Sequence, residues 1–303
     1  MLNNILYDLV YHSVPIILAV LGGIFAHKVN VLNIGLEGMM LMGAFSSALS
    51  VYITGNLWLG ILIGVILTLI IGLIFCLFSI TLKSNFIITG LGINLFVSML
   101  SSFILKAMGL ANINVSNVVN VADLKIHIPF IENIPILGPL LSGHTIITYF
   151  SFLMIILASV LMFKTKFGVY VRVVGENEEA AKSVGINVNK IKYISILIGA
   201  LLCAFAGANL SVERMALFTP DMTAGRGFIA IAAIFCGRGL PLRSTAYALV
   251  FGLARSLAIN LALFAGPVSG LLEMVPYLMI VIVLAIASGV ESKKTKIRGF
   301  KWE

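Results

Sequence analysis

The sequence predicts an all-α membrane protein with about nine transmembrane helices, some of them discontinuous, in two related halves. Of its 303 residues, 60% are hydrophobic and only 11% are charged, whereas soluble domains carry about 25% charged residues. Several apolar stretches reach the length of about 20 residues that crosses a bilayer. They must be helical, because lipid cannot satisfy free backbone groups. A soluble enzyme, a disordered chain, a collagen and a small disulfide-rich scaffold are therefore excluded.

Nine stretches are candidates for these helices. They are 11–26, 31–53, 57–82, 86–106, 145–163, 193–212, 227–237, 244–264 and 274–290. The stretch 31–53 opens with polar and glycine residues, and 227–237 is too short to cross unless it extends into its flanks. We expect one domain over residues 1–303, divided into a first half (11–106), an extracellular loop (107–144), a second half (145–290) and a basic tail (291–303).

The basic residues predict the orientation. Eleven of the twenty lie in two polar segments, 164–192 and 291–303, and an excess of Lys and Arg marks the cytoplasmic side. We therefore expect a cytoplasmic C-terminus and an extracellular 107–144 loop, since this loop contains a single basic residue, Lys125. An odd number of helices then places the N-terminus outside. The net charge of +8 is assigned to this topology and to anionic lipid headgroups, not to nucleic acid.

One carboxylate lies near the start of an apolar run. Glu37 follows Asn33 and is flanked by Gly35 and Gly38. A charge at the centre of a bilayer costs about 2.5 kcal/mol or more, so Glu37 needs a partner, a cavity or a helix terminus. Two interpretations remain open: a discontinuous helix that lines a translocation path, or a carboxylate that locks two helices together.

A similar feature occurs in the other half. Pro220, Gly225 and Gly227 interrupt the pattern before an apolar run, and Arg226 lies at its start. One interrupted, charged segment in each half is typical of a transporter built from two related halves.

Further polar residues lie inside the predicted helices. They either join helices or line a path. Arg255 needs a carboxylate, carbonyl groups or water, and Glu213 or Glu273 could serve. The candidate pathway residues are Asn33, Glu37, Thr89, Asn94, Asn209, Arg226 and Arg255.

The cytoplasmic stretch 172–192 predicts a short helix. We expect this helix to start near Glu176, where acidic residues cluster, and to end at Gly185, with Lys182 in its last turn. A solvated loop is the alternative, but a mere connection could be shorter, so we favour a docking surface. The sequence contains no Walker A motif, HExxH motif or nucleophile elbow, so we expect no enzymatic activity from this chain.

Three motifs resemble one family. One motif is similar to the EAA coupling loop of ABC importer permeases: it consists of Glu179-Ala180-Ala181, three further residues and then Gly185. The preceding Gly175-Glu176-Asn177 is similar to the GEN variant of that loop. The runs NIGLEGMM (33–40) and GRGFIAIAA (225–233) look like two further signatures of the branched-chain amino acid, ribose and nucleoside type. The closest resemblance is to the simple-sugar and nucleoside branch. The proline that is usual late in the broader EAA motif is absent.

The resemblance implies a permease subunit of the cell membrane that imports nucleosides by alternating access. Its partners would be a second, related permease, two ATPases that bind ATP and Mg²⁺, and an extracellular substrate-binding lipoprotein; this chain would bind no cofactor. The residues implied in ATPase coupling are Gly175, Glu176, Asn177, Glu179, Ala180, Ala181 and Gly185. Ribose, other simple sugars and branched-chain amino acids are alternative cargoes. A stand-alone secondary transporter or channel is a further alternative, which would need paired carboxylates in the membrane.

Overall fold

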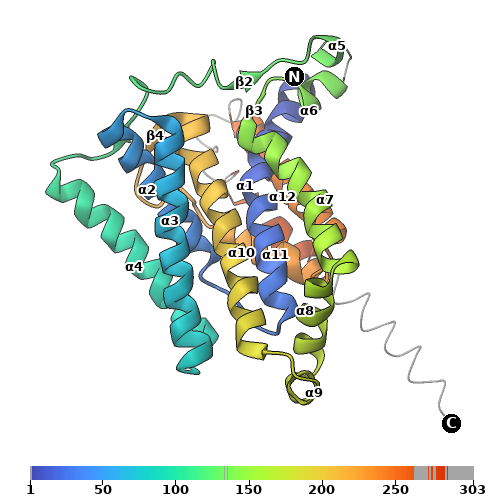
Figure 1. Ribbon diagram of the computed structural model, residues 1–303. Coiled ribbons are helices and arrows are strands. Elements are labelled where there is room, and N and C mark those ends of the chain that lie inside the picture. Colours follow the sequence, from blue (N-terminus) through green and yellow to red (C-terminus); the bar gives the residue numbers. More distant parts are fainter. Residues whose placement is uncertain are drawn as a thin grey trace.

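The computed structural model describes residues 2–132, 134, 136–262, 272, 274, 275, 278–283 and 285. Within these residues, seven helical stretches are long and apolar enough to cross a membrane (Figure 1). The long helices are α1 (Leu2–Lys28), α2 (Leu36–Thr54), α3 (Leu57–Cys76), α4 (Phe86–Ala107), α7 (Ile146–Lys164), α10 (Val188–Ala208) and α12 (Pro241–Ala262). Two of them continue as π-helical turns, α3 into η1 (Leu77–Thr81) and α10 into η2 (Asn209–Met215).

The structure confirms a helical, multi-pass protein but not nine long helices. The predicted stretch 227–237 is α11 (Arg226–Cys236), which has only 11 residues. The stretch 31–53 is helical only from Leu36, because residues 31–35 form a non-helical approach to α2. The predicted stretch 274–290 lies largely outside the described residues. At the N-terminus, α1 begins at Leu2 and is longer than the predicted 11–26.

The two ends of the helix bundle carry different structures (Figure 1). One end carries α8 (Lys166–Glu176) and α9 (Glu178–Ser183). The other end carries the start of α1 and the segment 107–144, which contains α5 (Pro129–Glu132) and α6 (Leu137–Leu141). The N-terminus and the 107–144 segment thus share an end, opposite to α9.

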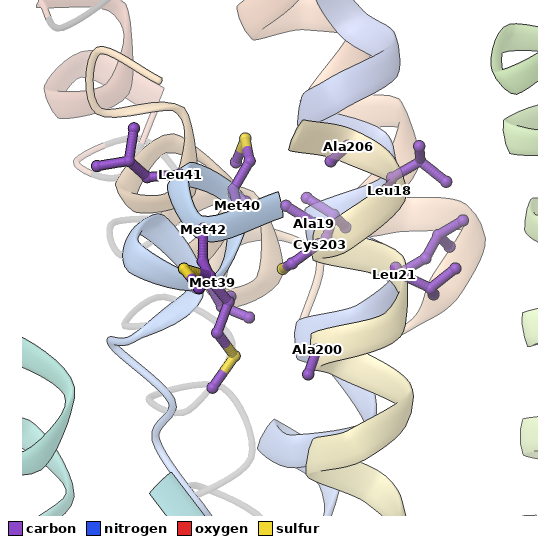
Figure 2. Packing of buried hydrophobic residues seen from close by; sticks show 14 of the residues in the cluster. Leu18, Ala19, Leu21, Met39, Met40, Leu41, Met42, Ala200, Cys203 and Ala206 are labelled. Carbon is purple, nitrogen blue, oxygen red and sulfur yellow. The ribbon is translucent and has the colours of Figure 1, made fainter. Parts of the chain in front are cut away.

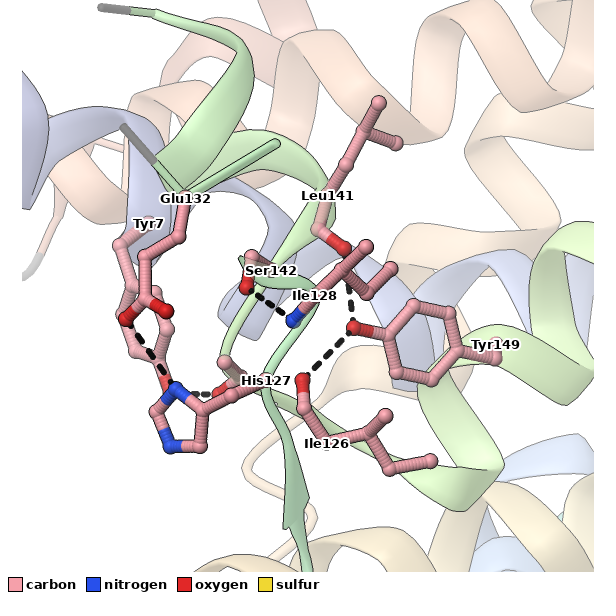
Figure 3. Close-up of polar contacts among 9 residues, drawn as sticks. Tyr7, Ile126, His127, Ile128, Glu132, Leu141, Ser142 and Tyr149 are labelled. Atoms are coloured by element: carbon pink, nitrogen blue, oxygen red, sulfur yellow. Dashed lines mark hydrogen bonds and ion pairs between the residues drawn. The ribbon is translucent and has the colours of Figure 1, made fainter. Parts of the chain in front are cut away.

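The described part of the 107–144 segment contains short strands that pair with other parts of the chain. Strand β1 (Ile113–Asn114) pairs antiparallel with β4 (Leu217–Phe218), and β2 (Lys125–Ile126) pairs antiparallel with β3 (His144–Thr145). The Tyr149 hydroxyl donates to the carbonyl groups of Ile126 at 3.2 Å and Leu141 at 2.9 Å, as Figure 3 shows. These contacts join the segment to the first turns of α7.

The core lies where α1, α2 and α10 pack together (Figure 2). Small residues allow the helices to approach at backbone contact. A Cβ atom on Gly207 would lie 2.2 Å from the carbonyl oxygen of Met40, and one on Gly22 would lie 2.9 Å from Cα of Gly199. Glycine at these positions therefore serves packing within the chain.

Helix α4 lies at the edge of the bundle, and its outer side is apolar. Leu95, Met99 and Phe103 are each more than 60% exposed. Such a surface is suited to lipid or to a second membrane subunit.

Candidate functional site

The two interrupted helices meet inside the bundle. The C-terminal end of α11 lies at the α9 end of the molecule, because the Phe235 ring contacts His27 and Lys28 Nζ donates to the Arg238 carbonyl group at 3.0 Å. Eleven residues at 1.5 Å each place the start of α11 about 16 Å further in. That distance is close to half the thickness of the hydrocarbon core, about 30 Å. The N-terminus of α11 therefore lies deep in the bundle.

Glu37 joins the N-terminal ends of α2 and α11. It is the second residue of α2, and its carboxylate accepts hydrogen bonds from the backbone N–H groups of Gly225, at 2.8 Å, and Gly227. The first N–H groups of a helix have no partner within the helix, and the helix dipole there favours a negative charge. Glu37 therefore caps α11 from the neighbouring helix. We name this arrangement the half-helix junction.

Glycine lets the two backbones approach at this junction. A Cβ atom on Gly227 would lie 2.5 Å from the backbone nitrogen of Glu37 and 2.6 Å from its Cα. Both atoms belong to the backbone, so neither could move aside as a flexible side chain would. Gly227 is therefore required for the close approach of α11 to α2.

Two asparagines satisfy the backbone before α2. Asn33 Oδ1 accepts from the Gly35 N–H group at 3.0 Å. From α4, Asn94 Oδ1 accepts from the Gly38 N–H group at 2.8 Å, and Asn94 Nδ2 donates to the Ile34 carbonyl group at 3.1 Å. Asn94 thus supplies the donor and the acceptor that water would supply outside the membrane.

Arg226 also belongs to the half-helix junction. Its Nη1 atom donates to the carbonyl groups of Met222 at 2.8 Å and Thr223 at 2.9 Å, so it holds the segment that leads into α11. Four of the seven candidate pathway residues therefore converge at this junction: Asn33, Glu37, Asn94 and Arg226.

Asn209 lies in a second capping site. Its Nδ2 atom donates to Glu213 Oε2 at 3.0 Å and to Thr145 Oγ1 at 3.3 Å. Glu213 is buried and accepts from the Ile147 N–H group at 3.2 Å, in the first turn of α7. Asn209 therefore joins η2 to α7. The sequence suggests Glu213 as a partner for Arg255, whereas its capping of α7 cannot be deduced from sequence spacing.

The last two candidate pathway residues lie apart from the junction's hydrogen bonds. Thr89 Oγ1 donates to Ser84 Oγ at 3.2 Å, at the start of α4. Arg255 lies in α12, and its Nε atom has no hydrogen-bond partner among the described residues. Of the two carboxylates that were considered for Arg255, Glu213 bonds to α7 instead, and Glu273 lies outside the described residues.

The predicted cytoplasmic helix exists, but it starts two residues later than expected. Asn177 Oδ1 accepts from the N–H groups of Glu179 and Ala180, both at 3.0 Å, and so caps α9. Gly185 has a φ of +81°, the left-handed conformation that glycine adopts readily after a helix. Glu176 ends α8 instead of opening α9.

The residues implied in ATPase coupling divide into two groups. Ala181 is buried, and a Cβ atom on Gly175 would lie 1.8 Å from the Lys28 carbonyl oxygen, so both pack inward. The other five are exposed: Glu176, Asn177, Glu179, Ala180 and Gly185. The sequence interpretation missed Val184, whose side chain is 72% exposed. It also missed the ion pair between Lys192 on α10 and Glu178, which ties α9 to the bundle.

We call the outward part of α9 and its end the α9 surface; it consists of Glu179, Ala180 and Lys182–Gly185. It combines charged and small side chains with one exposed apolar side chain, Val184. Val184 follows directly after the last residue of the capped helix α9, so its exposed side chain lies at the end of this surface.

These features define a polytopic membrane protein in which two half-helices meet inside the bundle and a short helix projects from one end. The chain belongs to the family described as branched-chain amino acid transport system / permease component, which matches residues 5–284.

Two relatives extend over nearly the whole chain. The nucleoside ABC transporter permease protein NupC of Lactococcus lactis is 31% identical, over 95% of this chain and 93% of its own length. The guanosine ABC transporter permease protein NupQ of Bacillus subtilis is 33% identical, over 90% of this chain and 88% of its own. A solved ABC transporter, described as inward-facing and of metal-chelate type, shares the fold with a TM-score of 0.50 at 16% identity. That match covers 94% of this chain and 85% of the other.

Proposed function

We propose that this chain is a transmembrane subunit of an ATP-driven importer that carries nucleosides across the cell membrane. Nucleosides are supported as the cargo by the similarity to NupC and NupQ over about nine-tenths of each chain. Ribose, other sugars and branched-chain amino acids are less favoured, because these full-length relatives are named for nucleosides.

Within this function, the α9 surface is the contact for an ATPase that binds ATP and Mg²⁺. The implied coupling residues Gly175, Glu176, Asn177 and Ala181 shape and hold α9, whereas Glu179, Ala180 and Gly185 present its surface. Because α9 is capped by Asn177 and paired with Lys192 through Glu178, movement imposed on it would pass to α10. The basic residues at this end support a cytoplasmic position for it.

At the opposite end, the 107–144 segment is the surface for an extracellular substrate-binding lipoprotein. A second permease subunit, related but not identical, would complete the path, and the exposed apolar side of α4 is one surface available to it. The half-helix junction would lie beside this path.

The arrangement of carboxylates argues against a secondary transporter or channel. Such a transporter would use carboxylates in the membrane that exchange ions or protons. Among the described residues, the carboxylates of Glu37 and Glu213 each accept from backbone N–H groups of another helix, and the two do not pair with each other. Their contacts support a structural role in holding two helix starts.

Uptake into cells tests the proposal. Cells that lack this chain would be offered labelled guanosine, adenosine, uridine, ribose and leucine, with and without a plasmid that restores the chain. We expect the plasmid to restore nucleoside uptake and to leave ribose and leucine uptake unchanged. Restoration of ribose or leucine uptake alone would contradict the nucleoside cargo.

A further inference from the structure

Asp221 is a carboxylate that the half-helix junction does not use. It lies in the segment between β4 and α11, it is exposed, and its backbone is in the left-handed region with a φ of +54°. The Ser98 hydroxyl, on α4, donates to Asp221 Oδ1 at 2.7 Å. Among the described residues, no other hydrogen bond or ion pair to this carboxylate is present.

The bond to Ser98 places Asp221 deep in the membrane. Ser98 lies twelve residues after Phe86 and nine before Ala107, at the two ends of α4. At 1.5 Å per residue, Ser98 is about 18 Å from one end of the helix and about 14 Å from the other, and the carboxylate lies beside it. An exposed charge at that depth cannot face lipid without a large cost. It must face either water in a path or another subunit.

The four candidate residues of the half-helix junction already hydrogen-bond to backbone groups. Asn33, Asn94 and Arg226 bond to backbone groups, and Glu37 caps α11. Asp221, in contrast, has oxygen lone pairs that remain available and an exposed position. It is therefore better placed to bind a molecule in the path than the four candidate residues of the half-helix junction.

We propose that Asp221, supported by Ser98, binds the vicinal hydroxyl groups of the sugar moiety of the transported molecule. A carboxylate accepts hydrogen bonds from two hydroxyl groups, and a serine hydroxyl can both donate and accept. The proposal rests on the nucleoside import proposed above, and it names the part of the cargo that the membrane site recognises.

The test compares two cargoes that differ only in these hydroxyl groups. Uptake of labelled guanosine and labelled 2′,3′-dideoxyguanosine would be measured at limiting concentration, with the full importer in cells. The variants are Asp221→Asn, Ser98→Ala and the control Ser159→Ala, at a half-buried serine of α7 that belongs to none of the proposed surfaces. Asparagine tolerates the left-handed backbone, so Asp221→Asn removes the charge without straining the turn.

We expect Asp221→Asn to lower the guanosine-to-dideoxyguanosine uptake ratio by about fivefold to tenfold, since hydrogen bonds to charged groups are the stronger ones. Ser98→Ala should shift the ratio in the same direction by a smaller factor, and Ser159→Ala should not shift it. The amount of assembled importer in the membrane, measured in parallel, should be unchanged.

Three results would overturn the proposal: an unchanged ratio in both variants, an equal loss for both cargoes, or loss of the assembled importer in Asp221→Asn and Ser98→Ala. The last result would assign Asp221 to a contact between subunits. Failure of the unsubstituted importer to take up any nucleoside would instead refute the proposed function.

Discussion

The carboxylate of Glu37 and the backbone N–H group of Gly225 are joined by a 2.8 Å hydrogen bond that spans 188 residues of sequence. Through it, the start of one half-helix caps the start of another inside the bundle. Bilayer lipid offers no water to these N–H groups, so a side chain must satisfy them. The negative charge of Glu37 also matches the positive N-terminal ends of both helices.

Neutralising Glu37 should weaken this junction. Glu37→Gln keeps the shape of the side chain but replaces one acceptor oxygen with a donor that faces an N–H group. We expect a loss of about 1–3 kcal/mol of stability and a clear drop in the Tm of the detergent-purified chain. Glu132→Gln, at an exposed acid on α5 whose side chain is 51% exposed, is the control. Equal Tm values for Glu37→Gln and the control would show that the junction contributes no stability.

A methyl group at Gly227 should separate the two half-helices. Gly227→Ala places Cβ 2.5 Å from a backbone atom of Glu37, whereas Cβ at Gly92 on α4 meets no atom within 4 Å. We expect Gly227→Ala to lower strongly the yield of monodisperse protein in size-exclusion chromatography, and Gly92→Ala to leave it unchanged. Equal yields of monodisperse protein from the two variants would contradict the requirement for glycine at position 227.

Much of this architecture could be predicted from the sequence, since apolar length and charge placement dominate in a membrane. The interruption before α2 was visible because Asn33, Gly35 and Glu37 break an apolar run. The nine predicted helices are not confirmed, because α11 has only 11 residues and the stretch 274–290 lies largely outside the described residues. The partner of Glu37 could not be predicted, because nothing in the local pattern indicates which distant N–H groups meet a carboxylate.

The coupling residues show a different limit. Asn177 and Gly185 were identified by the motif, and the structure shows one capping α9 and the other following its end. Which residues of this stretch face outward depends on how α9 packs. The inward position of Gly175 and the exposure of Val184 could therefore not be predicted from the sequence. Gly175 is required by the Lys28 carbonyl oxygen, a contact between segments almost 150 residues apart.

A charge on the α9 surface should uncouple the ATPase from transport. Val184→Asp replaces the exposed apolar side chain with a carboxylate and leaves the packing of the bundle intact. We expect nucleoside uptake to fall at least tenfold while the amount of the chain in the membrane stays unchanged. Thr54→Asp, at the exposed last residue of α2 and outside the 107–144 segment, is the control. Normal nucleoside uptake by the Val184→Asp variant would show that the α9 surface does not couple the ATPase to transport.

His144 should make the 107–144 segment sensitive to acid. Its ring stacks on Tyr7 with 4.7 Å between centroids, and Nε2 bonds to the Pro139 carbonyl group at 3.0 Å. Burial lowers the pKa of His144 below its usual value of 6.5. The unfolded chain therefore binds more protons than the folded chain between the folded pKa and about pH 6.5, so stability is full above that pH and falls as the pH drops below it.

The pH dependence of Tm checks this expectation. His144→Gln should flatten the fall in Tm between pH 7.5 and pH 5, whereas His127→Gln, at an exposed ring, should keep it. If the Tm of His144→Gln falls as steeply with pH as that of the unsubstituted chain, another group causes the loss of stability in acid.

The most direct test of the whole account is the energy source of transport. Membrane vesicles that contain this chain with its ATPase and binding protein would be loaded with ATP, or with a non-hydrolysable analogue, and offered labelled guanosine. We predict that labelled guanosine accumulates with ATP but not with the analogue. Gly185→Glu, on the α9 surface, should abolish this accumulation. Accumulation by the purified chain alone, driven by an ion gradient and unaffected by Gly185→Glu, would contradict the account.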